Sequence, residues 1–193
     1  MRGESGNGES EKKMSIEIDV LNGDASGQRA ESLFEAVWPR HVLEKLSWGD
    51  VQWANADLRV LIDAPSGDGL PGGLACHVGI FFRTVTWNGR KLDIGGIGGV
   101  STRPDCRRRG YASIALNAAV QTMRDHEAVQ FALLFCEPHN FAFYQSRGWH
   151  RFDGEIYAEQ PGGRFRFEAM APFVFDFARA PRQGVIDLCG LPW

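Results

Sequence analysis

The dipeptide Asn88–Gly89 is the sequence feature that most restricts the fold. It stands between two long strand-like stretches, residues 74–87 and 90–102. Asn-Gly fits the two left-handed positions of a type I′ turn, whose twist matches that of the strands it joins. We therefore predict a hairpin of two long strands, which must pair antiparallel.

The remaining hydrophobic periodicity predicts alternating strands and helices around this hairpin. Strict alternation of polar and apolar residues indicates strands, and apolar residues at three- and four-residue spacing indicate helices that end at proline, glycine or polar turns. We predict an α+β domain with a mixed, mostly antiparallel sheet flanked by helices on both faces. The expected strands are residues 15–20, 58–63, 129–136, 155–158 and 164–177, the expected helices are 26–38 (capped by Ser26), 41–48, 111–124 and 140–147, and residues 64–73 form a loop.

Length and composition fit one ordinary globular domain. Of the 193 residues, 44% are hydrophobic and the formal net charge is -3, which argues against a nucleic-acid-binding protein. The sequence has no apolar run of the ~20 residues that cross a membrane and no signal peptide, so we expect a cytoplasmic protein without a membrane partner. We expect a flexible tail at 1–13, a single domain at 14–193, no metal site, and four reduced cysteines, Cys76, Cys106, Cys136 and Cys189.

Residues 95–113 carry the clearest chemical signal, because a glycine-rich strand leads through an arginine-rich turn into a helix. Glycines weaken a strand, so their number suggests that a ligand or a backbone segment approaches closely. At the following helix N-terminus, free amides and the helix dipole favour an anion such as phosphate, and guanidinium groups add positive charge. A basic turn that faces only solvent is the alternative.

The segment Arg107–Ala112, R-R-R-G-Y-A, resembles the Q/R-x-x-G-x-G/A signature of the GNAT superfamily of acyl-CoA-dependent N-acyltransferases. The resemblance includes its position, between the family's fourth strand and third helix. It implies acetyl-CoA as co-substrate, with Val100 and Thr102 contacting the pantetheine arm through their main chain. It also implies a pyrophosphate site formed by Arg107, Arg108, Arg109, Gly110, Tyr111, Ala112 and Ser113.

A second segment, Glu137–Trp149, is similar to the family's N-x-x-A-x-x-F-Y-x-x-x-G-F helix. The resemblance implies that Tyr144 is the general acid for the leaving thiolate and that Asn140 and Phe143 lie in the coenzyme site. Glu137 replaces the family's asparagine and Asn140 its alanine, so pantetheine contacts differ there. Glu137 is either a general base or a solvated loop carboxylate, and the aromatic residues of the helix could instead be its core face.

Within the superfamily, residues 30–193 most resemble the aminoglycoside 2′-N-acetyltransferases, through W-N-G, I-G-G-V-S-T-R-P-D, F-Y-Q-S-R-G-W and Trp193. Those enzymes bind a cationic sugar with carboxylates, one of them on the fourth strand, where this sequence has Gly98. Other carboxylates could substitute: Asp50, Asp153, Glu155, Glu168, Asp187 and the main-chain carboxylate of Trp193.

These observations predict an N-acetyltransferase that transfers an acetyl group to a primary amine of a small molecule by direct attack, with an aminoglycoside-like acceptor as one option. The alternative is a coenzyme A-binding sensor that has lost turnover. The long strand expected at residues 164–177 could pair across a homodimer. His77 is either a core or a catalytic histidine, and Trp38, Trp48 and Trp53 either line the acceptor pocket or pack in the core.

Overall fold

A computed structural model describes residues 16–67, 70–126 and 129–193, and the tail expected at residues 1–13 lies outside them. No helix of the described chain is long and apolar enough to cross a membrane. The elements, in chain order, are β1 (Glu17–Asn22), α1 (Gly23–Val37), α2 (Arg40–Leu43), β2 (Leu58–Gly67), β3 (Leu70–Trp87), β4 (Arg90–Thr102), the 3-10 turn η1 (Pro104–Cys106), α3 (Tyr111–Arg124), β5 (Phe131–Cys136), the 3-10 turn η2 (Pro138–Asn140), α4 (Phe141–Gln145), β6 (His150–Arg151), β7 (Glu155–Gln160), β8 (Gly163–Arg166), β9 (Ala171–Asp176) and β10 (Val185–Asp187).

The predicted hairpin is confirmed. β3 and β4 pair antiparallel up to Trp87 and Arg90, and Asn88 and Gly89 have φ values of 47° and 80°, the two left-handed positions of a type I′ turn. The described strands form one ten-stranded sheet in the order β6-β9-β5-β4-β3-β10-β7-β8, with β2 also on β3 and β1 on β2. Among the described pairs, β4–β5 and β10–β7 are parallel and the others antiparallel, so the predicted α+β class with a mixed sheet is confirmed.

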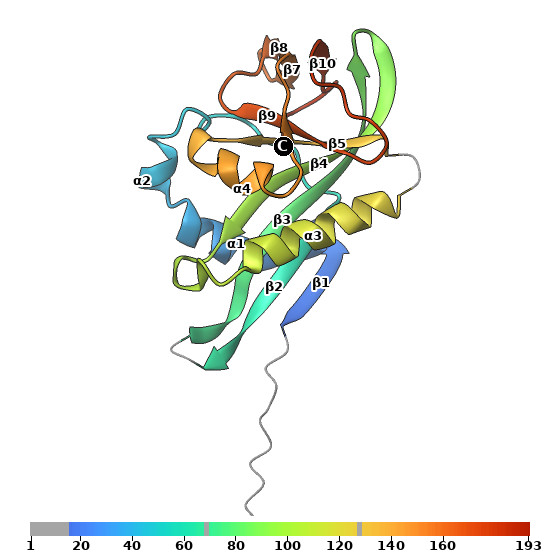
Figure 1. Cartoon of the computed structure of the whole chain (residues 1–193). Helices are drawn as coiled ribbons and strands as arrows, with labels where there is room; N and C mark the ends of the chain where they lie inside the picture. Colours follow the sequence, from blue (N-terminus) through green and yellow to red (C-terminus); the bar gives the residue numbers. More distant parts are fainter. Residues whose placement is uncertain (1–15, 68–69, 127–128) are drawn as a thin grey trace, which may run out of the picture.

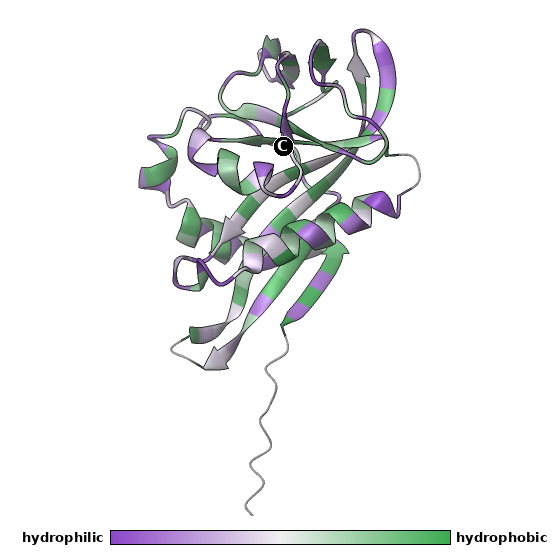
Figure 2. Ribbon diagram, viewed as in Figure 1, coloured by the Kyte–Doolittle hydropathy of each residue, from purple (hydrophilic) through white to green (hydrophobic). Residues whose placement is uncertain are grey.

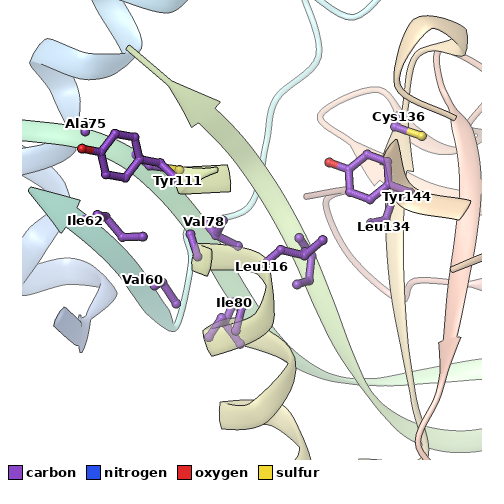
Figure 3. Packing of buried hydrophobic residues seen from close by; sticks show 14 of the residues in the cluster. Val60, Ile62, Ala75, Val78, Ile80, Tyr111, Leu116, Leu134, Cys136 and Tyr144 are labelled. Atoms are coloured by element: carbon purple, nitrogen blue, oxygen red, sulfur yellow. The ribbon is translucent and has the colours of Figure 1, made fainter. Parts of the chain in front are cut away.

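Helices cover both faces of this sheet. α3 lies across β2, β3 and β4 (Figure 1) and buries Leu116, Ala119 and Met123 against them. Because side chains alternate along a strand, Val78 and Ile80 of β3 point to the α3 face (Figure 3). His77, the residue before Val78, points to the opposite face, where it contacts Phe34 of α1.

The parallel pairing of β4 with β5 is short and ends inside the sheet. It runs from Gly95 opposite Ala132 to Ile97 opposite Leu134. Beyond Ile97, the β3–β4 register shifts and Gly99 takes a left-handed conformation with φ 58°. Such a bulge bends a strand and disrupts its pairing. β4 and β5 therefore separate, and the main chain of each is left without a partner strand on the side facing the gap.

The glycines of β4 make room for the protein's own side chains. A Cβ atom at Gly95 would lie 2.2 Å from the Met123 sulfur, and one at Gly96 would lie 2.4 Å from the Trp193 indole. The expected approach of a backbone segment is found at Gly98, where the main-chain carbon of Trp193 would lie 2.8 Å from a Cβ atom, but at Gly95 and Gly96 the approaching groups are side chains from α3 and the C-terminal segment. Only Gly99 has the left-handed φ that opens the strand.

Several predicted boundaries are wrong. Residues 164–177 do not form one strand, because the chain leaves β8, turns Phe167 into the core and enters β9 far away in the sheet. Since β9 lies between β5 and β6, it is not free to pair across a dimer. The loop expected at residues 64–73 is occupied by the ends of β2 and β3. Helix α1 begins earlier than expected, capped by Asn22 rather than Ser26.

Candidate active site

A cleft of about 1180 Å³ opens where β4 and β5 separate. Pockets for one drug-sized ligand measure roughly 300–1,000 Å³, so this cleft has room for more than one small reactant. Nearly all of the site residues expected from the sequence line it. They are Val100, Thr102, Arg107, Arg108, Gly110, Tyr111, Ala112, Ser113, Glu137, Asn140, Phe143 and Tyr144. Arg109 is the exception, because its side chain is exposed and lies outside the cleft.

The turn before α3 forms a concave row of amides at one end of the cleft. Arg108 and Gly110 have φ values of 62° and 86°, and Gly110 caps the helix without a side-chain hydrogen bond. Within the described chain, no amide of residues 108–112 donates to a main-chain carbonyl. Free amides in a turn that contains left-handed residues make an anion-binding concavity, and the helix dipole adds to it. The amide of Ser113, also expected to be free, donates instead to Gly110.

Positive charge surrounds this concavity. The turn is hydrophilic (Figure 2), and Arg107 and Arg108 line the cleft beside it. Arg147, which sequence reasoning did not single out, reaches from the end of α4. It donates to the Ser113 hydroxyl over 2.5 Å and lies 3.9 Å from the Phe143 ring centre. Arg147 therefore connects α4, which carries the second motif of the resemblance, to the first turn of α3. Its position within the motif F-Y-Q-S-R-G-W is the sequence signal that could have identified it.

Tyr144 lies across the cleft from β4, close to the end of β5. Its ring is 5% exposed, and Figure 3 shows its hydroxyl pointing from the β5 side toward β4. Burial, and to a lesser degree the neighbouring Cys136, raises the pKa of this phenol well above its usual value. The hydroxyl therefore keeps its proton at neutral pH and can donate it to a group that becomes negatively charged.

The cleft cysteine Cys136 is a poor nucleophile. Burial raises the pKa of its thiol to about 12, so the reactive thiolate is scarce at neutral pH. Cys106, which also lines the cleft, has its pKa raised by burial. Neither residue is arranged to form a covalent bond with a substrate.

Glu137 is the acidic residue closest in sequence to Tyr144. It directly follows β5, is half-buried and lines the cleft beside Asn140. His139 is exposed, and its ring lies 3.1 Å from the Asn140 amide. A carboxylate at this position can accept a proton inside the cleft.

The β4 bulge is held from behind by a buried histidine. His77 is 1% exposed, with Nδ1 2.8 Å from the Gly99 carbonyl and Nε2 2.9 Å from the Arg59 guanidinium. Burial, together with Arg59, lowers the pKa of His77 to about 4. Since arginine only donates, Nε2 must accept and the proton must sit on Nδ1. His77 is thus a neutral core histidine that fixes the Gly99 carbonyl.

An aromatic surface continues the cleft beyond the bulge. We call it the aromatic wall, and it consists of Trp38, Trp48, Trp53, Phe81, Phe135 and Trp193. Trp38, Trp48 and Trp53 therefore lie where an acceptor pocket was expected. Sequence reasoning missed Phe81 and Phe135, and it named Trp193 only for its main-chain carboxylate and its place in the resemblance; the three come from separate elements.

Five of the six carboxylates expected to bind a cation lie elsewhere, but the main-chain carboxylate of Trp193 lies at the cleft, against Gly98. Asp187 pairs with Arg164, and Glu155 and Glu168 pair with Arg166. Neither Asp50 nor Asp153 lines the cleft. At Gly98, a Cβ atom would lie 2.8 Å from the main-chain carbon of Trp193, which leaves no room for an acidic side chain.

Comparison with known proteins agrees with this geometry. The profile of the Acetyltransferase (GNAT) domain matches residues 32–152. The GNAT family N-acetyltransferase YhbS from Escherichia coli, solved in complex with CoA, shares 14% identity at a TM-score of 0.61, covering 93% of both chains. Escherichia coli ElaA shares 17% identity at a TM-score of 0.55, covering 84% of this chain and all of its own. A GNAT family acetyltransferase from Brucella melitensis, in complex with acetyl-CoA, shares 14% identity at 0.52, covering 89% and 94%.

The split mixed sheet, with an amide concavity at the open end of its cleft, defines the class of this protein as an acyltransferase with an acetyl-CoA-binding fold. More particularly, the chain belongs to the GNAT family of acetyltransferases.

Proposed function

We propose that this protein transfers the acetyl group of acetyl-CoA to a primary amine of a small molecule by direct attack of the amine on the thioester. The observation that carries the proposal is the gap between β4 and β5, which leads from the amide concavity at residues 108–112 to the Tyr144 hydroxyl. This one path presents an anion site at one end and a proton donor at the other.

Different residues along the cleft bind different parts of the coenzyme. The amides of residues 108–112, with Arg107 and Arg108, bind the pyrophosphate. The β4 main chain near Val100 and Thr102, which has no partner strand across the gap, binds the pantetheine arm, with Asn140 and Phe143 on the opposite wall. The Thr102 carbonyl also accepts from Arg107 Nε over 3.3 Å. The bulge at Gly99, fixed by His77, orients the main chain beside the thioester.

Proton movement is assigned to two side chains. Glu137 accepts a proton from the attacking ammonium, directly or through water, because an amine attacks only in its neutral form. Tyr144 donates its proton to the departing thiolate, and the second proton that the attacking nitrogen loses on forming the amide restores the phenol. Its raised pKa means that the phenol is protonated before the reaction begins. The raised pKa of Cys136 favours direct attack over a covalent enzyme intermediate.

Calorimetric titration with coenzyme A and acetyl-CoA tests the coenzyme site. Arg107→Ala removes a charged donor inside the cleft, worth ~1.5–3 kcal/mol for a bond to a charged group, so affinity should fall about tenfold or more. Arg109→Ala removes the same charge just outside the cleft and should leave affinity nearly unchanged. Gly110→Glu, with a left-handed φ and a carboxylate beside the anion site, should abolish binding.

Amine-dependent thiol release then tests the reaction. Absence of coenzyme binding to the unmodified protein would overturn the proposal. Saturable binding without thiol release for any amine, aminoglycosides included, supports the alternative of a coenzyme A sensor.

An aminoglycoside is one candidate acceptor under this proposal. Each ammonium of such a substrate needs a charge-assisted partner. Among the described residues, the side-chain carboxylates that line the cleft are Glu35 and Glu137. Together with the main-chain carboxylate of Trp193 against Gly98, the lining offers three carboxylates, which favours an acceptor with few charges.

A further inference from the structure

The aromatic wall is a rigid, preformed surface. Its rings are fixed by contacts with one another: Trp38 and Trp48 have centres 5.8 Å apart at 89°, and Trp48 and Trp53 have centres 5.9 Å apart at 79°. Phe167 connects Trp53 to Phe135, with ring centres 6.0 and 4.7 Å away, and Phe135 and Phe81 lie 6.1 and 5.7 Å from Trp193. Edge-to-face and offset contacts at these distances are the favourable aromatic geometries. Because the rings are held by each other, a ligand meets a wall that is already in place.

The wall directly adjoins the β4 bulge. Phe34 of α1 lies 4.8 Å from the His77 ring, which holds Gly99, and 5.7 Å from Trp38. At the other side, the main chain of Trp193 lies against Gly98. A molecule seated on the wall therefore reaches the main chain at which we place the thioester.

The charges around the wall limit what can sit there. The described cleft has two side-chain carboxylates and the main-chain carboxylate of Trp193 against Gly98, while Arg59, Arg107, Arg108 and Arg147 are cationic groups in its lining. A polycation would lose the hydration of several ammonium groups without gaining matching partners. A single ammonium group, in contrast, is attracted to the π face of tryptophan.

We propose that the acceptor is a primary monoamine on a flat apolar or aromatic body, the arylalkylamine class, and that the aromatic wall binds this body. The inference rests on the proposed acetyltransferase function and adds the chemical class of the acceptor. The aromatic wall contacts the aryl body by stacked and edge-to-face packing. Low polarity also disfavours the charged form of an amine, which helps Glu137 to take up the proton.

A panel of amines at saturating acetyl-CoA tests the class. The probes are 2-phenylethylamine and tryptamine, their non-aromatic control ethylamine, and the polycation kanamycin. We expect kcat/KM for the two arylalkylamines to exceed that for ethylamine and kanamycin at least tenfold. Higher kcat/KM for kanamycin or ethylamine would overturn the inference and leave the proposed function standing.

Two further outcomes separate the inference from the function on which it rests. If the protein binds acetyl-CoA but acetylates neither arylalkylamine, the inference is wrong while the coenzyme site stands. If it binds no acetyl-CoA, the proposed function and the inference both fail.

Variants connect the specificity to the wall itself. Trp53 is half-buried in the cleft lining, so Trp53→Leu should raise KM for 2-phenylethylamine about tenfold without changing acetyl-CoA affinity. Trp53→Phe, which keeps an aromatic face, should lie between the two. Trp87→Leu is the matched control, because Trp87 is also half-buried but outside the cleft, bonded to the Gln183 carbonyl. An unchanged KM in Trp53→Leu, or an equal rise in Trp87→Leu, would overturn the assignment to the wall.

Discussion

The buried imidazole of His77 has only one protonation state compatible with its neighbours. The guanidinium of Arg59 faces Nε2 at 2.9 Å, and a proton on that nitrogen would point a second positive charge at it. The Gly99 carbonyl faces Nδ1 and requires a donor. His77 therefore stabilises the β4 bulge in its neutral form, with the proton on Nδ1.

His77 gives the protein a pH-dependent stability with a defined sign. Its pKa is about 4 when folded against 6.5 in the unfolded chain, so between these values only the unfolded chain binds the proton. The free energy of unfolding should fall as the pH decreases from 6.5 to 4, by at most ~3 kcal/mol from this residue. Urea denaturation at several pH values measures the slope.

The matched variants are His77→Gln, which cannot titrate, and His150→Gln at an exposed position. The first should flatten the dependence between pH 6.5 and 4, and the second should leave it unchanged. Identical slopes in His77→Gln and the unmodified protein would contradict the neutral, buried assignment.

A Tyr144 variant distinguishes between an enzyme and a coenzyme A sensor. Removing only its hydroxyl, in Tyr144→Phe, should lower kcat by about 100-fold if it protonates the leaving thiolate. Coenzyme A affinity and thermal stability should stay nearly constant, because the ring remains in the core. Tyr157→Phe, a tyrosine outside the cleft, is the control. An unchanged kcat in Tyr144→Phe would remove the general acid from the mechanism.

At the scale of elements, β4 depends on glycine to admit Trp193. The indole lies 2.4 Å from the site of a Gly96 Cβ and donates to the Leu133 carbonyl of β5 over 3.2 Å. Gly96→Ala should force the ring away and lower the free energy of unfolding by ~1–3 kcal/mol, the usual cost of overpacking. Gly162→Ala, where nothing lies within 4 Å, should change it little. Chemical denaturation compares the two, and equal stabilities would contradict this packing role.

Elements set by local chemistry were predicted accurately, and those set by distant contacts were not. The turn at Asn88–Gly89, strand β4 and helix α3 have the predicted bounds because turn residues and helical periodicity are local signals. The break between β8 and β9 is not visible in an apolar stretch, since it depends on Phe167 reaching the core. β10 is three residues long and exists through pairing with β3 and β7, distant in sequence.

The same distinction applies to the site. The amide concavity could be found because its residues are consecutive, and Tyr144 because it belongs to a contiguous motif. The contact of Arg59 with His77 could not, and of the aromatic wall only Trp38, Trp48 and Trp53 were named as a pocket lining, since the other members come from separate elements that only the folded sheet brings together. The side chain of Arg109 was wrongly included in the predicted site, because a run of three arginines does not reveal which side chain lies outside the cleft.

On the scale of the whole molecule, the cleft divides one sheet into two parts joined at β4 and β5 by a short parallel pairing. A ligand that binds between these strands contacts both parts of the folded sheet and neither in the unfolded chain. Binding only to the folded state raises stability by mass action. Coenzyme A should therefore stabilise the entire domain rather than one loop.

The size of this effect follows from affinity and chain length. At 100 times its Kd, coenzyme A should add ~2.7 kcal/mol, which for a domain of this size raises Tm by about 5–10 °C. A thermal scan of the unmodified protein and of Gly110→Glu at the same coenzyme concentration measures it. Because the glutamate faces the amide concavity, the variant should show almost no shift. An equal shift in both proteins would mean that coenzyme A binds somewhere other than the end of the cleft formed by residues 108–112.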